Sequence, residues 1–182
     1  MDERLPGIRP RQSLWRRLDM SARWSFPAAT TALLCILTAA PLGLPAQAEL
    51  QGAIALASVF FWSLFRPASM LPPVVFLLGV LVDLLDYAPP GVAVLTLLLV
   101  HGLALHWRRV LVRQGFLMVW LTFAGIASGA AALQWVLTSV LVFRLLPPGP
   151  GVFQAVLAAG LYPMLAVVLT RAHQTLAEPQ LA

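Results

Sequence analysis

Residues 76–91 read Phe76-Leu-Leu-Gly79-Val-Leu-Val-Asp83-Leu-Leu-Asp86-Tyr-Ala-Pro-Pro-Gly91. An apolar run comes first, two carboxylates lie at its end, and a proline-proline-glycine turn follows. On insertion scales an aspartate at the bilayer centre costs about 2.5–3.5 kcal/mol, so its presence in an apolar run requires a reason. The pattern predicts an apolar helix that ends in a turn, with carboxylates near its last residues.

The rest of the chain is equally poor in charge. Its 182 residues are 60% apolar and 10% charged, whereas ordinary soluble domains are roughly 45–50% apolar and about 25% charged. So few charges cannot cover the surface of a water-soluble fold of this size. We therefore expect an all-α, polytopic membrane protein.

Clusters of proline and glycine divide the apolar sequence into six segments. The second, third and fourth are shorter than the about 20 residues that a perpendicular helix needs, and the fifth is long enough to tilt. Counts of five or seven spans stay open on apolarity alone. The six predicted spans are 26–44, 50–65, 70–85, 92–105, 116–143 and 152–170.

The basic residues favour six spans and set the orientation. All 12 are arginines, and six of them precede the first span. With both termini in the cytoplasm, only Arg144 faces outward, as the positive-inside rule requires. We expect a cytoplasmic tail over 1–25, a membrane domain over 26–170 and a cytoplasmic tail over 171–182. A signal peptide cleaved near Ala48 is the alternative, but its removal would destroy this charge asymmetry.

Other residues exclude several classes of function. The arginines lie at predicted membrane boundaries, so they do not indicate nucleic-acid binding. Residues 13–22 mix apolar side chains with arginine, which is typical of a helix lying on membrane lipid. Cys35 is the single cysteine, so no intramolecular disulfide can form. His101 and His106 are five residues apart and lack the chain of partners that a proton relay needs. We expect no metal and no cofactor.

Asp83 and Asp86 are the main candidate polar residues. In one hypothesis either carboxylate pairs with Arg144, which the six-span topology places on the same side of the membrane. In the alternative both carboxylates simply reach interfacial water, and this suits Asp86 better because Asp83 lies about one turn deeper. Metal-dependent chemistry would need companion residues that the chain lacks, so we expect no enzyme.

A second motif, Gly125-Ile-Ala-Ser128-Gly129, lies in the fifth predicted span. Small residues at this spacing let helix backbones approach closely in lipid. We expect the face to pack inside the protein, and contact with a partner's helix is the alternative. An intramembrane serine protease is excluded because no histidine occurs in a suitable context.

The stretch from Phe76 to Gly91 resembles MreD, the rod shape-determining membrane protein family. That family typically reads F-x-x-G-x-x-x-D, followed by a small polar turn and a glycine that opens the next helix. Phe76, Gly79, Asp83 and Gly91 match this pattern, whereas the double proline and Asp86 are less typical. The resemblance implies a fold similar to the six-helix substrate-binding subunits of vitamin transporters.

The resemblance also implies a non-enzymatic scaffold of the bacterial cell-wall elongation machinery, located in the inner membrane. Its expected partners are an MreC-like protein and, through it, MreB and the RodA–PBP2 synthase pair. The rival hypothesis is a small-molecule-binding transporter subunit, which needs convergent polar groups on the outer side. We expect few such groups, because the chain has no asparagine and no lysine. The candidate contact residues are Gly79, Asp83, Asp86, Gly91, Gly125, Ser128, Gly129 and Arg144.

Overall fold

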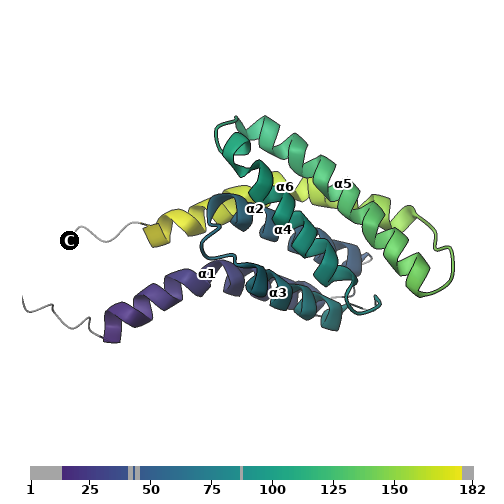
Figure 1. Ribbon diagram of the computed structural model, residues 1–182, viewed down its shortest axis with the longest axis horizontal. Coiled ribbons are helices and arrows are strands. Elements are labelled where there is room, and N and C mark those ends of the chain that lie inside the picture. Colours follow the sequence, from purple (N-terminus) through teal and green to yellow (C-terminus); the bar gives the residue numbers. More distant parts are fainter. Residues whose placement is uncertain (1–13, 41–42, 44–45, 87, 178–182) are drawn as a thin grey trace, which may run out of the picture.

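The computed structural model describes residues 14–40, 43, 46–86 and 88–177, with backbone alone for 14–23 and 172–177. In this part of the chain six α-helices and no strands are present, which confirms the all-α fold (Figure 1). The helices are α1 (Leu14–Ala39), α2 (Gln47–Phe65), α3 (Pro72–Leu85), α4 (Val92–Leu111), α5 (Phe116–Leu141) and α6 (Gly149–Ala177).

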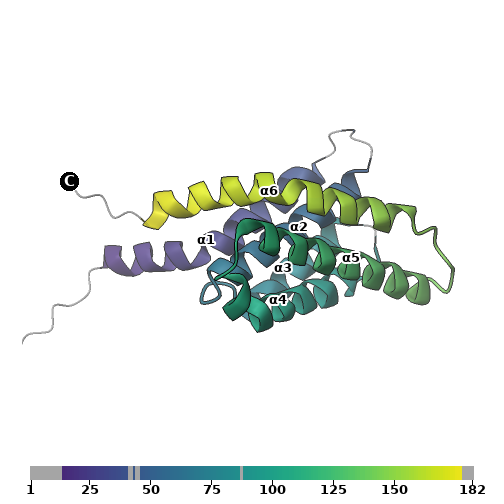
Figure 2. The same cartoon turned by 90° about the horizontal axis from the view of Figure 1, so that it is seen from above.

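Successive helices run in alternating directions along the long axis of the molecule. The start of α1 and the end of α6 therefore lie at the same end, on the left of Figures 1 and 2. The α3–α4 and α5–α6 connections lie at the opposite end. The α2–α3 and α4–α5 connections lie at the end where α1 begins.

Helix α2 lies at the centre of the bundle and contacts every other helix. All its residues from Ala53 to Leu64 are buried. Of its apolar span 72% is buried, against 22% for the span in α6. Alanines and serines make up much of this run, so neighbouring helices can approach it closely from several sides. The other helices carry their remaining apolar surface on the outside.

Four helices are long and apolar enough to cross a membrane. These are α2, α4, α5 and the part of α6 from Gly149 to Arg171. The apolar part of α1, Trp24–Ala39, and helix α3 are shorter. Large apolar side chains such as Leu117 are exposed along the outer faces, an arrangement that lipid tolerates and water does not. The chain is a multi-pass membrane protein.

Three helices extend beyond the predicted membrane spans. Helix α1 begins at Leu14, which agrees with the helix expected over 13–22, and α6 continues to Ala177. The assignment of 1–25 and 171–182 to the cytoplasm stays a prediction. Helix α4 continues to Leu111, so most of the segment between the predicted spans 92–105 and 116–143, which we expected to be a basic loop, is helical. Arginine is a good helix former, and near a helix C-terminus it also interacts favourably with the helix dipole. Residues 1–13 of the predicted arginine-rich tail lie outside the described residues.

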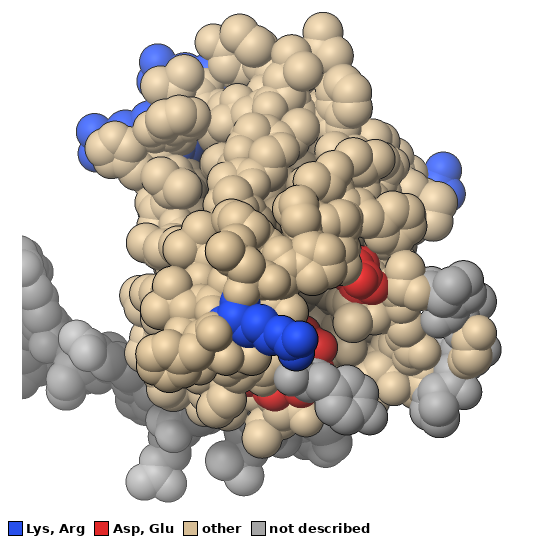
Figure 3. Space-filling model, turned by 90° about the vertical axis from the view of Figure 1, so that its right-hand side faces the viewer, with Lys and Arg blue, Asp and Glu red and all other residues tan. Residues whose placement is uncertain are grey.

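The described acidic side chains lie at one end of the bundle, and most of the described arginines lie at the other. The described acidic residues Glu49, Asp83 and Asp86 flank the connections at one end, which we call the acidic end. Figure 3 looks onto this end and shows the red acidic side chains near one another, with a blue basic side chain in front of them, on a mostly uncharged surface. Arg144 also lies at this end, in the α5–α6 connection. The opposite end, called the arginine end, carries Arg66, Arg108, Arg109, Arg113 and Arg171.

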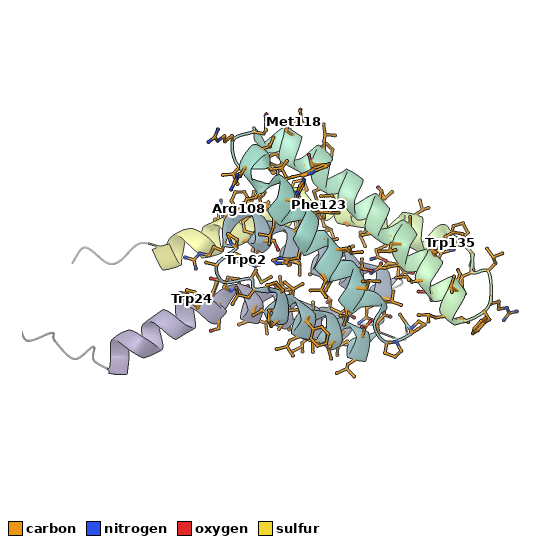
Figure 4. The ribbon with its side chains drawn as sticks, in the orientation of Figure 1. Trp24, Trp62, Arg108, Met118, Phe123 and Trp135 are labelled. Carbon is orange, nitrogen blue, oxygen red and sulfur yellow. The ribbon has the colours of Figure 1, made fainter. Side chains whose placement is uncertain are left out.

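Aromatic packing and a helix-end hydrogen bond hold the helices around α2. The ring of Phe60 on α2 lies 5.1 Å from that of Phe123 on α5, which in turn stacks at 4.4 Å on Tyr162 of α6. At the arginine end, Arg108 Nε of α4 donates to Leu64 O near the end of α2, at 2.8 Å. The last carbonyls of a helix lack partners within it, so this bond satisfies one of them. Figure 4 labels Arg108, Phe123 and Trp62 of α2.

Candidate functional site

Gly79 lies at a point where α3 and α4 approach each other closely. A Cβ atom built on Gly79 would lie 2.5 Å from the backbone Cα of Val94 on α4. Real Cβ atoms essentially never come this close to backbone, so any larger residue here would push the two helices apart. The glycine of the F-x-x-G-x-x-x-D pattern is therefore required by packing between these two helices.

Asp83 binds the first backbone N–H groups of α4. Its Oδ2 accepts from Gly91 N at 2.8 Å and from Val94 N at 3.3 Å, and its Oδ1 accepts from Ala93 N at 2.9 Å. These N–H groups have no partners within the helix, and the helix dipole favours an anion at this position. Asp83 thus acts as an N-terminal cap supplied by a neighbouring helix.

Gly91 completes this arrangement. It is the N-cap residue of α4 and has φ +97°, a left-handed conformation that side-chain-bearing residues rarely adopt. Three of the four residues that carry the MreD resemblance therefore meet in one structural unit, which we call the α3–α4 junction (Gly79, Asp83, Gly91 and Val94). Phe76, the fourth, is 48% exposed on the outside of α3 and takes no part in it.

The predicted pairing between Asp83 and Arg144 is not what the structure contains. Both carboxylate oxygens of Asp83 bind α4, and the described residues record no ion pair between Asp83 and Arg144. The N–H groups at the start of α4, 8 to 11 residues after Asp83, therefore take the place that Arg144 was expected to have. The pairing between Asp86 and Arg144 stays a prediction. Asp86 itself is half-buried and lines a cavity at the acidic end.

The Gly125–Gly129 motif does not pack inside the protein, contrary to expectation. Both glycines are exposed, and a Cβ atom on either would meet nothing within 4 Å. Ser128 is exposed too, and its hydroxyl donates to Ala124 O of its own helix at 2.8 Å. The buried face of α5 is instead formed by Val119, Phe123, Ala127, Ala130 and Ala131. The small-residue face of α5 therefore points away from the bundle.

A shallow groove of about 370 Å³ runs beside this face, between α5 and α6. Its walls are mostly small residues, so helix backbone lies close to the surface there. We call it the α5–α6 groove, and its main lining residues are Ser128, Ala132, Trp135, Gly151, Ala155 and Ala159.

A second cavity, of about 270 Å³, opens at the acidic end between α2, the α3–α4 turn, α5 and α6. Its polar lining residues are Glu49, Asp86, Gln134, Thr138 and Gln154. We call it the acidic pocket. The expectation of few convergent polar groups at this end is therefore wrong. Glutamines within apolar spans were the available signal, because polar side chains in a membrane segment are rare and commonly functional.

The buried histidine has a structural partner. His101 on α4 lies with Nδ1 2.7 Å from Ser63 Oγ on α2, and Ser63 in turn donates to Val59 O at 2.6 Å. Ser63 thus links the imidazole of His101 to the backbone of α2. The other ring nitrogen, Nε2, has no hydrogen-bond partner among the described residues. His106 is exposed, so the two histidines do not cooperate.

Compared with known proteins, the chain matches no family model, no curated protein and no solved structure.

Proposed function

We propose that the chain is a non-enzymatic scaffold of the MreD type, which holds proteins of the cell-wall elongation machinery together in the bacterial inner membrane. The observation that carries this proposal is the exposed small-residue face of α5, with the α5–α6 groove beside it. The α3–α4 junction adds support, because it gives the resemblance-bearing residues a shared structural role.

The exposed face of α5 suits a transmembrane helix of a partner. In lipid no hydrophobic driving force brings helices together, so association depends on close van der Waals packing between small residues. Gly125, Ser128 and Gly129 leave their backbone open on the outside, and α6 adds further small residues along the groove. A helix of an MreC-like protein is the occupant that we propose.

The positive-inside rule supports an orientation with the arginine end in the cytoplasm. Five described arginines lie there, and the helices that lead to both termini end on that side. A cytoplasmic filament protein such as MreB would then meet the arginine end, whereas contacts with extracytoplasmic domains would be made at the acidic end.

Co-purification tests the proposed docking face. The full chain, tagged and expressed in its own host, is purified with the MreC-like protein, and the double variant Gly125→Leu/Gly129→Leu is compared with wild type. We expect capture to fall at least tenfold, because two isobutyl groups prevent close helix approach. Gly102→Leu is the matched control, since Gly102 on α4 is also exposed with open space beside it.

Cell shape tests the function as a whole. Depletion of the chain is expected to cause rounding or swelling that rich medium does not rescue, and the double variant should fail to restore rod shape. Equal capture by wild type and the double variant would contradict the docking face. Normal shape together with a nutrient requirement would contradict the scaffold.

The acidic pocket favours a second candidate, a small-molecule-binding subunit of a transporter. A cavity lined by apolar residues and a few convergent polar groups is typical of ligand sites. The nutrient requirement named above is the outcome that would select this candidate.

A further inference from the structure

The acidic pocket has the position of a ligand site that opens at one membrane surface. Its walls come from the start of α2, the α3–α4 turn, the last turns of α5 and the start of α6. Helices that are far apart in the sequence thus enclose a cavity of about 270 Å³. Figure 3 looks onto the end of the bundle at which it opens.

The charge of the pocket selects the charge of the ligand. Glu49 and Asp86 are both half-buried and line the cavity, and no lysine, arginine or histidine lines it. A carboxylate that is partly removed from water is stabilised by a cation nearby and destabilised by another anion. The pocket therefore favours a positively charged ligand over phosphates and carboxylates.

The uncharged side chains of the pocket, two amides and an indole, suit a ligand that is positively charged and donates hydrogen bonds. Gln154 Nε2 donates to Gln134 Oε1 at 2.9 Å, which fixes the two amides relative to each other. Trp135 also lines the cavity, and its Nε1 donates to Leu146 O at 2.9 Å, which holds the ring in place. A cation near an indole face is attracted by the ring electrons. Fixed groups of this kind reduce the entropic cost of binding.

A bare metal ion fits this pocket poorly. In the part of the chain that the structure describes, no group of three histidine, cysteine, aspartate or glutamate residues could hold one. Calcium and magnesium ions take six or more oxygen ligands, and the two carboxylates of the pocket supply only part of such a set. An ammonium group instead needs only a few acceptors, and carboxylate and amide oxygens supply them.

The geometry points to the acidic pocket as a binding site for a protonated amine. This inference goes beyond the proposed scaffold role and does not depend on it. The amine has two possible sources, a small water-soluble amine or the ammonium headgroup of a membrane lipid. The second source follows from the lining, because Ala131, Trp135 and Gly151 border both the acidic pocket and the lipid-facing α5–α6 groove.

Thermal unfolding of the purified full chain in detergent tests the site. Benzylamine is titrated at neutral pH alongside benzyl alcohol and benzoate, which keep the ring and change the charge. We expect only benzylamine to raise the melting temperature, and Glu49→Gln to raise its half-maximal concentration at least tenfold. In a second arm, phosphatidylethanolamine is compared with phosphatidylglycerol of the same acyl chains, and stabilisation by the former alone assigns the lipid source.

Two further variants separate binding from folding. Ala48→Trp fills the pocket mouth without removing a charge and should abolish the response to the amine. Arg109→Gln removes an exposed charge at the arginine end, away from the pocket, and its response should match wild type within twofold. The inference is overturned if neither amine stabilises the protein, if benzyl alcohol or benzoate stabilises it equally, or if both Glu49→Gln and Ala48→Trp respond like wild type.

Discussion

The α3–α4 and α5–α6 hairpins carry similar glycine signals and use them in opposite ways. In the first, Gly79 lies against the backbone of Val94, where a Cβ atom would be only 2.5 Å away. In the second, Gly125 and Gly129 have open space beside them. A glycine in a membrane helix therefore indicates that close approach is available at that point. Whether the approach is used inside the chain depends on which helix face the whole bundle turns inward.

The two hairpins also differ in what joins their helices. Between α3 and α4 the joining group is a carboxylate that binds three backbone N–H groups at a helix start. Between α5 and α6 two single hydrogen bonds occur, from the indole Nε1 of Trp120 to Ala159 O at 2.8 Å and from Gln154 Nε2 to Gln134 Oε1 at 2.9 Å. The first hairpin should accordingly be the more sensitive to single substitutions, and four measurements test that difference.

Gly79→Leu should have the largest effect. The side chain would meet the backbone of α4, which cannot move aside as a flexible side chain could, so we expect a loss of about 3 kcal/mol or more. Thermal unfolding in detergent measures it, and Gly79→Ala should fall between this variant and wild type. Gly102→Leu introduces the same side chain into open space and should unfold like wild type. Equal melting temperatures for the two leucine variants would contradict the packing described here.

Asp83→Ala should have the next largest effect. It leaves the first N–H groups of α4 without their acceptor, and we expect a loss of about 2 kcal/mol. Asp83→Asn keeps one acceptor oxygen, so its melting temperature should lie between those of Asp83→Ala and wild type. Leu84→Ala is the control, because its side chain is 79% exposed beside the junction. A melting temperature for Asp83→Ala within error of wild type would show that the cap is dispensable.

Trp120→Phe tests the corresponding bond of the α5–α6 hairpin. It removes the indole donor and keeps an aromatic ring, so we expect a loss of about 1 kcal/mol at most, since hydrogen bonds between membrane helices are weak on average. The same thermal assay applies, with Trp107→Phe as control because Trp107 is 48% exposed. A loss larger than that of Asp83→Ala would reverse the order of the two hairpins.

Gly129→Leu should not destabilise the isolated protein. Its new side chain meets no other atom, and leucine is a better helix former than glycine by up to about 1 kcal/mol. The melting temperature should therefore be unchanged or slightly higher, even though the double variant with Gly125→Leu is expected to lose its partner. A clear fall in melting temperature would mean that this face packs within the chain after all.

The helix order and most boundaries followed from simple sequence signals. Prolines at both ends predicted 70–85, and the structure has Pro72–Leu85. Proline is tolerated in the first turn of a helix and disfavoured further along it. The end of α4 was missed because Arg108 and Arg109 suggested a loop, whereas their side chains are compatible with helix up to Leu111.

The site was less predictable, because its contacts are tertiary. We expected Asp83 to pair with a cation. Residue propensities describe caps within a helix, so they do not predict that a carboxylate at the end of one helix will cap the next helix. The direction of the Gly125–Gly129 face depends on how α5 packs on α2 and α6. Glu49, Gln134 and Gln154 are far apart in the sequence, and only the folded bundle brings them around one cavity.

The cap on α4 has a consequence for how the chain enters the membrane. Helix α3 has 14 residues, about 21 Å at 1.5 Å per residue, which is shorter than the roughly 30 Å of hydrocarbon. A segment that is short and carries a carboxylate is a poor substrate for insertion by itself. The groups that bind Asp83 follow only 8 to 11 residues later, so they leave the ribosome immediately afterwards. The two segments should therefore be inserted together as one hairpin, with the carboxylate already bound before it meets the lipid.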